Sequence, residues 1–114
     1  MAKVFLEQLE WQKPEHGFPK RYGFFCPGCL LFQKVLHPEW DEEKVKSFSL
    51  HMINVETVHS FNYDMDNPTF YPSLLWNLPS LGLVCHSYVE NGIIRYLADC
   101  THPLKGQEIS LPEL

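Results

Sequence analysis

Four cysteines constrain the fold of this 114-residue chain more than any other feature of its sequence. Cys26 and Cys29 form a C-x-x-C knuckle, in which a tight turn brings two thiolates toward one metal ion. Cys85 and Cys100 lie on either side of the dipeptide Asn91-Gly92. Two cysteine pairs in one short chain are typical of a tetrahedral zinc site, so we expect these four residues to hold one structural Zn²⁺.

The dipeptide Asn91-Gly92 predicts a β-hairpin within residues 84–97. It separates two strand-like runs, and this residue pair favours a two-residue type I′ turn, because both of its positions need a positive φ. A turn of this kind fixes the pairing of the strands, so that Val89 faces Ile94 and the pairs on either side follow in step.

The same register sorts the side chains onto two faces, because they alternate along a strand. Cys85 shares one face with Cys100, whereas His86 shares the other face with Asp99. The alternative metal site replaces one cysteine by His86 or His102. A redox role for the C-x-x-C knuckle is less favoured, because we expect the knuckle to follow a strand and not to stand at a helix start in a βαβ unit.

Charge and hydropathy limit the partners and the location. The net charge of −5 argues against nucleic acid and anionic membranes as partners, because phosphate binding needs a basic face. No apolar run reaches the ~18 residues that span a bilayer. The N-terminal residues lack the apolar stretch of a signal peptide. We therefore expect a cytoplasmic protein, whose cysteines are metal ligands and not disulfides.

The nine prolines and six glycines divide the chain into short elements. We expect one domain over residues 1–114, of α+β class and mostly β: a small compact β domain stapled by zinc, with a C-terminal hairpin and one short helix. The expected strands and loops are a strand at 3–10, a loop at 14–19, a strand at 22–25, one or two strands within 47–61 and an irregular or edge-like segment at 67–74. The short helix is expected at 37–46, because Pro38 suits its first turn and acidic residues precede basic ones.

Catalytic candidates centre on His86. Its same-face neighbour Asp99 would fix the tautomer of the imidazole, which is the base-and-orienter half of a hydrolytic triad. In the alternative without catalysis, Asp99 caps a turn and His86 fills the core. The nucleophile would be a serine brought near by the fold, and Ser73 follows a constrained, proline-rich segment. Ser87 points to the cysteine face by parity, and the remaining candidates are Ser80 and Ser110.

Four motifs occur in order: F-x-C-P-G-C at 24–29, P-T-F-x-P-S-L at 68–74, C-H-S-F/Y at 85–88 and D-C-T-H-x-L-x-G-Q at 99–107. Together they resemble a family of short phage and bacterial proteins of unknown function, often mislabelled as ammonia monooxygenase. The resemblance runs from Tyr22 to about Pro112, and residues 37–58 look like an insert. The departures from the family pattern, which remove no proposed ligand or catalytic residue, are Tyr63, Pro103 and Lys105.

The resemblance implies a function. Some members look to be encoded beside bacterial ubiquitin-like conjugation enzymes and are viewed as serine-type peptidases that trim or remove the tag. Carried over, this implies Ser73 as nucleophile and His86 as base, with Asp99 or His102 assisting. The monooxygenase label is not carried over, because copper or iron in an oxygen-accessible site differs from a thiolate cage.

Three functions are therefore in view. The favoured one is a serine-type peptidase or isopeptidase that processes a ubiquitin-like or other protein partner and contains a structural zinc. The second is a non-enzymatic, zinc-stabilised binding protein, such as a phage accessory protein that inhibits a host factor, with Trp40, Tyr71 and Trp76 at its interface. The third is a zinc-dependent hydrolase, which requires that only three cysteines bind the metal.

Overall fold

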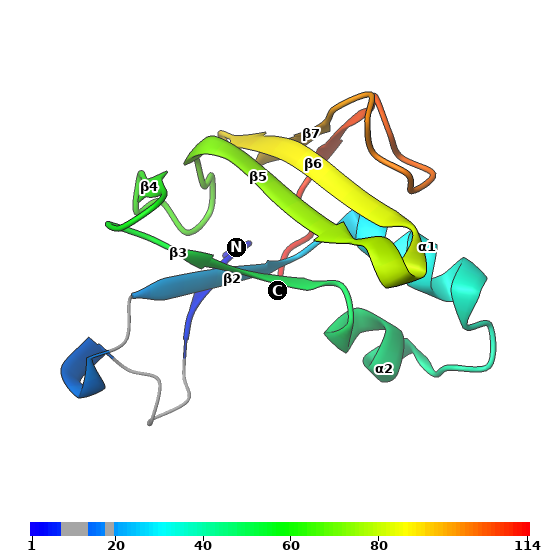
Figure 1. The fold of residues 1–114 in the computed structure, drawn as a ribbon. Coiled ribbons are helices and arrows are strands. Elements are labelled where there is room, and N and C mark those ends of the chain that lie inside the picture. The colour runs from blue at the N-terminus through cyan, green and yellow to red at the C-terminus, as the bar shows by residue number, and fades with distance from the viewer. Residues whose placement is uncertain (8–13, 18–19) are drawn as a thin grey trace.

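The structure is a computed structural model that describes residues 1–7, 14–17 and 20–114. It contains a three-stranded and a five-stranded antiparallel sheet, which confirms the mostly β, α+β class (Figure 1). The first sheet has the order β1-β2-β3, with β1 (Phe5–Leu6), β2 (Arg21–Phe25) and β3 (Leu50–Asn54). The second has the order β4-β5-β6-β7-β8, with β4 (Ser60–Phe61), β5 (Phe70–Leu78), β6 (Leu83–Glu90), β7 (Ile93–Tyr96) and β8 (Glu108–Ser110).

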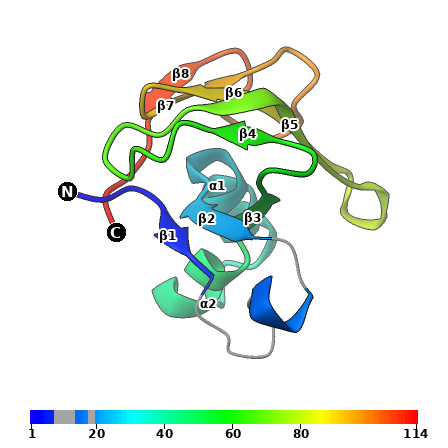
Figure 2. The same ribbon diagram turned by 90° about the vertical axis from the view of Figure 1, so that its left-hand side faces the viewer.

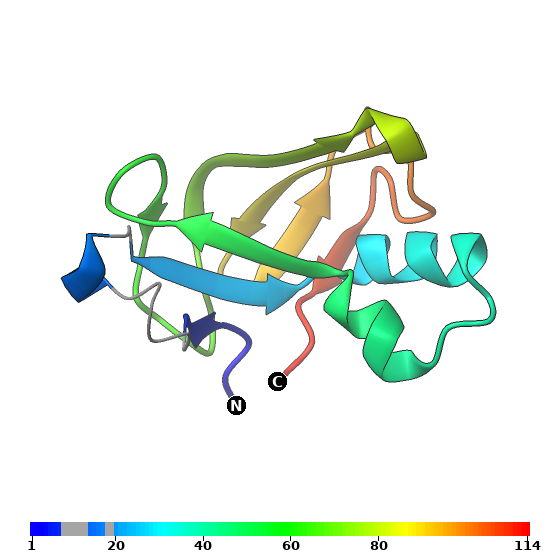
Figure 3. The same ribbon diagram turned by 60° about the horizontal axis from the view of Figure 1, so that its bottom comes forward.

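The two sheets form layers with the apolar core between them (Figure 2). Alternate residues of β6 are buried, as expected for a strand with one face against a core. Phe24 of β2 and Phe70 of β5 approach each other across the layers, with ring centroids 6.3 Å apart. The two ends of the described chain lie close together, and the Leu114 N–H donates to the carbonyl of Ala2 at 2.9 Å (Figure 3).

Two helices occupy the same end of the molecule (Figure 1). The predicted short helix is present as α2 (Glu42–Ser47), and it begins later than expected because the Asp41 side chain accepts the Lys44 N–H as an N-cap. A second helix, α1 (Pro27–Leu36), was not predicted. Pro27 is its first residue, a position where the missing N–H costs nothing.

The knuckle therefore does stand at a helix start, contrary to expectation. It does not belong to a βαβ unit, because β2 and β3 pair antiparallel. The described residues also form short 3₁₀ turns, η2 (Pro14–His16) and η3 (Pro79–Leu81). Of the expected first strand, residues 5–6 form β1, and 8–10 lie outside the described residues. Of the expected loop, 18–19 also lie outside them.

The hairpin is confirmed. Val89 pairs with Ile94, and both turn residues have positive φ, 51° at Asn91 and 77° at Gly92. The segment expected to be irregular enters β5, where the register shifts between Phe70 and Leu74. Among the described helices, none is long and apolar enough to cross a membrane.

Candidate active site and metal centre

Strand β6 carries two different groups of side chains on its two faces. Cys85 points into the core and is fully buried, whereas the next residue, His86, points to the outer face and is partly exposed. The alternation of side chains along a strand thus separates a buried cluster from a solvent-facing network.

The buried cluster consists of Cys26, Cys29, His51 and Cys85, whose candidate ligand atoms all lie within 4.8 Å of one another. The Cys26 and Cys85 sulfurs are 3.7 Å apart, and the Cys29 sulfur lies 3.3 Å from His51 Nε2. Tetrahedral zinc, with Zn–S of ~2.3 Å and Zn–N of ~2.0–2.1 Å, gives edges of about 3.8 Å and 3.5 Å for these two kinds of pair. The donor set and its spacing therefore fit one tetrahedral ion.

Three chain segments bring the cluster together. Cys26 lies between β2 and α1, and its N–H donates to the Ser49 carbonyl at 2.9 Å. Cys29 follows within the first turn of α1. His51 lies on β3 directly opposite Phe24, so the β2–β3 pairing carries it to the knuckle. The helix N-terminus beside these sulfurs favours the thiolate form of a cysteine.

The fourth member of the buried cluster is His51 and not Cys100, which the sequence predicted beside the three other cysteines. The predicted hairpin pairing stops at Tyr96, and the chain then turns, with the Cys100 N–H donating to the Leu97 carbonyl at 3.2 Å. This turn directs the Cys100 sulfur to the backbone of His86, whose N–H it accepts at 3.2 Å and whose carbonyl it contacts at 3.1 Å. Continued pairing would have put Cys100 on the face of Cys85.

Contacts within the cluster shift the pKa values of its cysteines in opposite directions. Burial raises the pKa of Cys26, but hydrogen bonds from Cys29, Cys85 and His51 outweigh burial, so its pKa is lowered overall. The hydrogen bond with Cys26 and burial raise the pKa values of Cys29 and Cys85. A bound divalent cation would supply the positive charge that keeps all three sulfurs deprotonated.

A second layer of contacts surrounds Cys26. The Tyr96 hydroxyl accepts the Gly28 N–H at 2.9 Å and lies 3.1 Å from the Cys26 sulfur. Burial, followed by the charge of Cys26, raises the pKa of Tyr96, so the hydroxyl stays protonated and can donate to that sulfur. Gly28 also permits close packing, because a Cβ there would lie 2.3 Å from the His102 ring.

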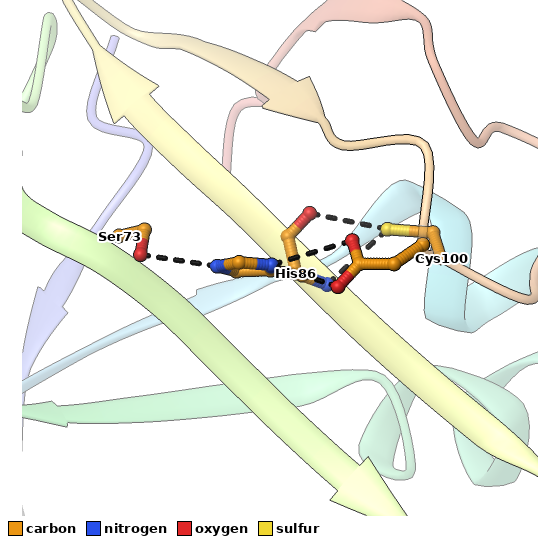
Figure 4. A network of polar contacts seen from close by, with 4 residues as sticks. Ser73, His86 and Cys100 are labelled. Carbon is orange, nitrogen blue, oxygen red and sulfur yellow. Dashed lines mark hydrogen bonds and ion pairs between the residues drawn. The ribbon is translucent and has the colours of Figure 1, made fainter.

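The solvent-facing network joins Ser73, His86 and Asp99 (Figure 4). The Ser73 hydroxyl lies 3.1 Å from His86 Nε2, and the Asp99 carboxylate lies 3.0 Å from His86 Nδ1. A carboxylate only accepts, so Nδ1 carries the proton and Nε2 is free to accept from the serine. The order serine, histidine, aspartate is that of a hydrolytic triad.

Each member of this network comes from a different element. Ser73 lies on β5 next to β6, where the register shifts, and His86 lies opposite Leu75. Asp99 lies in the turn that follows β7, the same turn that directs Cys100 to the His86 backbone. The turn thus holds His86 from two sides, at its imidazole and at its main chain.

The loop before β5 is pinned by side-chain amides and hydroxyls. Asn62 Oδ1 accepts the backbone N–H groups of Asp64 and Thr69, at 3.1 and 3.0 Å. Thr69 Oγ1 in turn accepts the Asn91 N–H at 2.8 Å, which ties this loop to the hairpin turn. The loop that leads into β5 and to Ser73 is therefore held both by Asn62, which follows β4, and by the hairpin turn.

The other predicted residues lie elsewhere. His102 is buried, its Nδ1 accepts the Leu104 N–H at 3.3 Å, and burial lowers its pKa. Ser87 is buried on the inner face, as parity predicted. Of the remaining two serine candidates, Ser80 lies on η3. Ser110 lies on β8, where its hydroxyl accepts a hydrogen bond from the Lys3 ammonium.

The aromatic residues expected at an interface do not share one environment. Trp40 stacks on His37 and also contacts Phe48. Tyr71 is exposed, and Trp76 stacks on His51 with ring centroids 3.6 Å apart. Sequence reasoning missed His51. A polar residue at an inward position of the alternating run 50–55 was the available signal, because buried polar side chains need partners.

Comparison with known proteins agrees with this geometry. The sequence profile of the BubE family, described as bacterial ubiquitination-like system serine protease, matches residues 5–97. The chain therefore belongs to the BubE family. No curated protein and no solved structure matches the chain at a significant level.

Proposed function

We propose that this protein is a serine-type peptidase or isopeptidase that acts on a protein of a bacterial ubiquitination-like system. The observation that carries the proposal is the unbroken chain of contacts from Ser73 Oγ through the His86 imidazole to Asp99, at 3.1 and 3.0 Å. The family description supports the same class of reaction.

The reaction has two halves. The Ser73 oxygen attacks the carbonyl carbon of the scissile bond while His86 Nε2 takes the hydroxyl proton. The C–N bond then breaks, and the imidazolium returns that proton to the leaving amine. Water next attacks the acyl-serine carbonyl and gives one proton to His86. The C–O bond to Ser73 then breaks, the imidazolium gives that proton to the Ser73 oxygen, and the acid product leaves as a carboxylate after losing its own proton to solvent. Asp99 holds Nδ1–H and stabilises the imidazolium throughout.

We propose that the metal is a structural zinc held by Cys26, Cys29, His51 and Cys85. Four protein ligands close a tetrahedral site, and a closed site has no position for a reacting water. When bound, the ion supplies cross-linking between α1 and the two sheets. Ser73 and His86 carry out the proton transfers on the opposite face of β6.

The test is covalent labelling with a fluorophosphonate, which reacts with an activated serine. We expect phosphonylation at Ser73, mapped by mass spectrometry, and loss of labelling in His86→Ala. The zinc content, measured by elemental analysis, stays at one ion per chain in both proteins. Labelling that is absent from the metal-loaded wild type, or equal in His86→Ala, contradicts the proposal.

A further inference from the structure

Strand β5 has an open edge that begins at the proposed nucleophile. On the side away from β6, β5 pairs with the two residues of β4, at Phe70 and Tyr71. Within the described part of the chain, no strand pairs with this side of residues 73–78. Figure 1 shows this stretch of β5 running on past β4.

The hydrogen bonds of β6 reveal which groups line this edge. The His86 backbone bonds to Leu97 and Cys100, and the Val84 backbone bonds to Thr101, so both point away from β5. Two residues that lie opposite each other in an antiparallel pair form one of two kinds of pair: either both direct their N–H and C=O groups toward the partner strand, or both direct them away from it. Leu75, opposite His86, and Asn77, opposite Val84, therefore direct their N–H and C=O groups to the open edge.

These edge groups have no hydrogen-bond partner among the residues that the structure describes. The carbonyl of Ser73 points to the same side, where it lies 3.1 Å from His59 Nε2. His59 thus closes the edge at the β4 end, and the free stretch starts two residues beyond the nucleophile. An unpaired edge of this kind is a template for another extended chain.

A pocket of about 250 Å³ adjoins the edge. Its wall includes Leu75 of β5 and Val58 before β4, which are 58% and 68% exposed. These two side chains offer apolar contacts to a side chain of a chain lying on the edge, and Asn54 and His59 add polar groups to the same lining. Residues of β3 also line the pocket, among them Met52.

We propose that the substrate protein binds as an extended strand added to the edge of β5 at Leu75 and Asn77, with one apolar side chain in the pocket beside Val58. This inference rests on the proposed function, since the strand would lead its scissile carbonyl to Ser73. The partner presents an extended segment, a tail or a loop, because only an extended backbone with free N–H and C=O groups can hydrogen-bond along a strand edge.

The first experiment tests the substrate backbone. The full-length, metal-loaded protein is screened with random internally quenched fluorescent peptides, and the best one is N-methylated at each amide in turn. Every second N–H of a strand faces one partner. We expect alternate methylations on one side of the cleaved bond to lower kcat/KM about tenfold, and those between them to have much smaller effects. A uniform response along the peptide overturns the proposal.

The second experiment tests the enzyme backbone. Leu75→Pro removes an edge N–H that β6 does not use, whereas Leu75→Ala keeps this donor and shortens only the side chain. We expect the proline variant to lose about tenfold more kcat/KM than the alanine variant, with fluorophosphonate labelling of Ser73 retained. Equal losses in the two variants overturn the proposal. If the proline variant is not labelled, the methylation scan decides.

The two proposals fail in different ways. If the wild type is labelled at Ser73 and cleaves peptides without an alternating response, only the strand-addition inference falls. If the wild type is not labelled and cleaves no peptide, both the proposed function and the strand-addition inference are wrong.

Discussion

The inner and outer faces of β6 differ in almost every respect except their backbone. On the inner face, Cys85 is fully buried in the cluster that joins β2, α1 and β3. On the outer face, His86 and Asp99 are 26% and 58% exposed. The comparison shows how strand alternation lets adjacent residues serve separate tasks: one set can secure the fold while the other stays open to a substrate. Variants on the two faces should therefore affect stability and activity independently.

The largest effect is expected on the inner face. Cys85→Ser should unfold the protein or abolish metal binding, because the folding free energy from a structural zinc, ~10–16 kcal/mol in small zinc domains, rivals total stabilities of ~5–15 kcal/mol. Elemental analysis and thermal unfolding measure the outcome. A folded Cys85→Ser variant with one zinc per chain would contradict the metal assignment.

Cys100→Ser is the matched control for that variant. Cys100 is also buried but lies outside the cluster, against the His86 backbone. We expect it to keep one zinc per chain and to remain folded. Loss of zinc in Cys100→Ser but not in His51→Ala would restore the four-cysteine site that the sequence suggests.

The next effect is on the outer face. Ser73→Ala should lower the rate of peptide cleavage by at least about 10⁴-fold, because the nucleophile is removed, while the unfolding temperature and zinc content stay unchanged. Rates of cleavage and calorimetry of the same samples measure it. Ser80→Ala, on η3, is the control and should keep the wild-type rate. A Ser73→Ala variant that cleaves normally, but stops when a chelator is added without unfolding, would point to zinc as the catalyst.

Asp99→Asn should have a smaller effect, about 10²–10³-fold on kcat. The amide cannot stabilise the imidazolium, but Asp99 is more than half exposed, so water compensates in part. The folding stability of the Asp99→Asn variant should change little, because residue 99 lies at the surface. Steady-state kinetics across a pH series measure this loss. An Asp99→Asn variant with wild-type kcat at all pH values would remove Asp99 from the triad.

The smallest predicted effect sharpens the comparison within the inner face. Tyr96→Phe leaves the buried Gly28 N–H without an acceptor, which costs about 1–3 kcal/mol of unfolding free energy. It should also weaken metal affinity by about 10–100-fold, because the hydroxyl contacts Cys26. Denaturant unfolding and competition with a zinc chelator measure both. Tyr88→Phe, on the outer face, should change stability by less than about 0.5 kcal/mol.

Part of the site was predictable because it depends on local geometry. The Asn91-Gly92 turn sets the hairpin register, and alternation then separates Cys85 from His86. The knuckle was predictable for the same reason, since its two cysteines are three residues apart. The residues alone left Ser73 as one of four candidate serines, and the resemblance singled it out, because no local rule states which distant serine a fold brings to a histidine.

By itself, the sequence determined the hairpin, its two faces, the mostly β class and three of the four clustered residues. Only the tertiary structure decided the rest: that His51 joins the cluster, that the knuckle begins a helix, and that Ser73 lies 3.1 Å from His86. The physical reason is range. Turn chemistry and alternation act over a few residues, whereas the β2–β3 pairing, the register shift in β5 and the turn after Tyr96 depend on packing between distant segments.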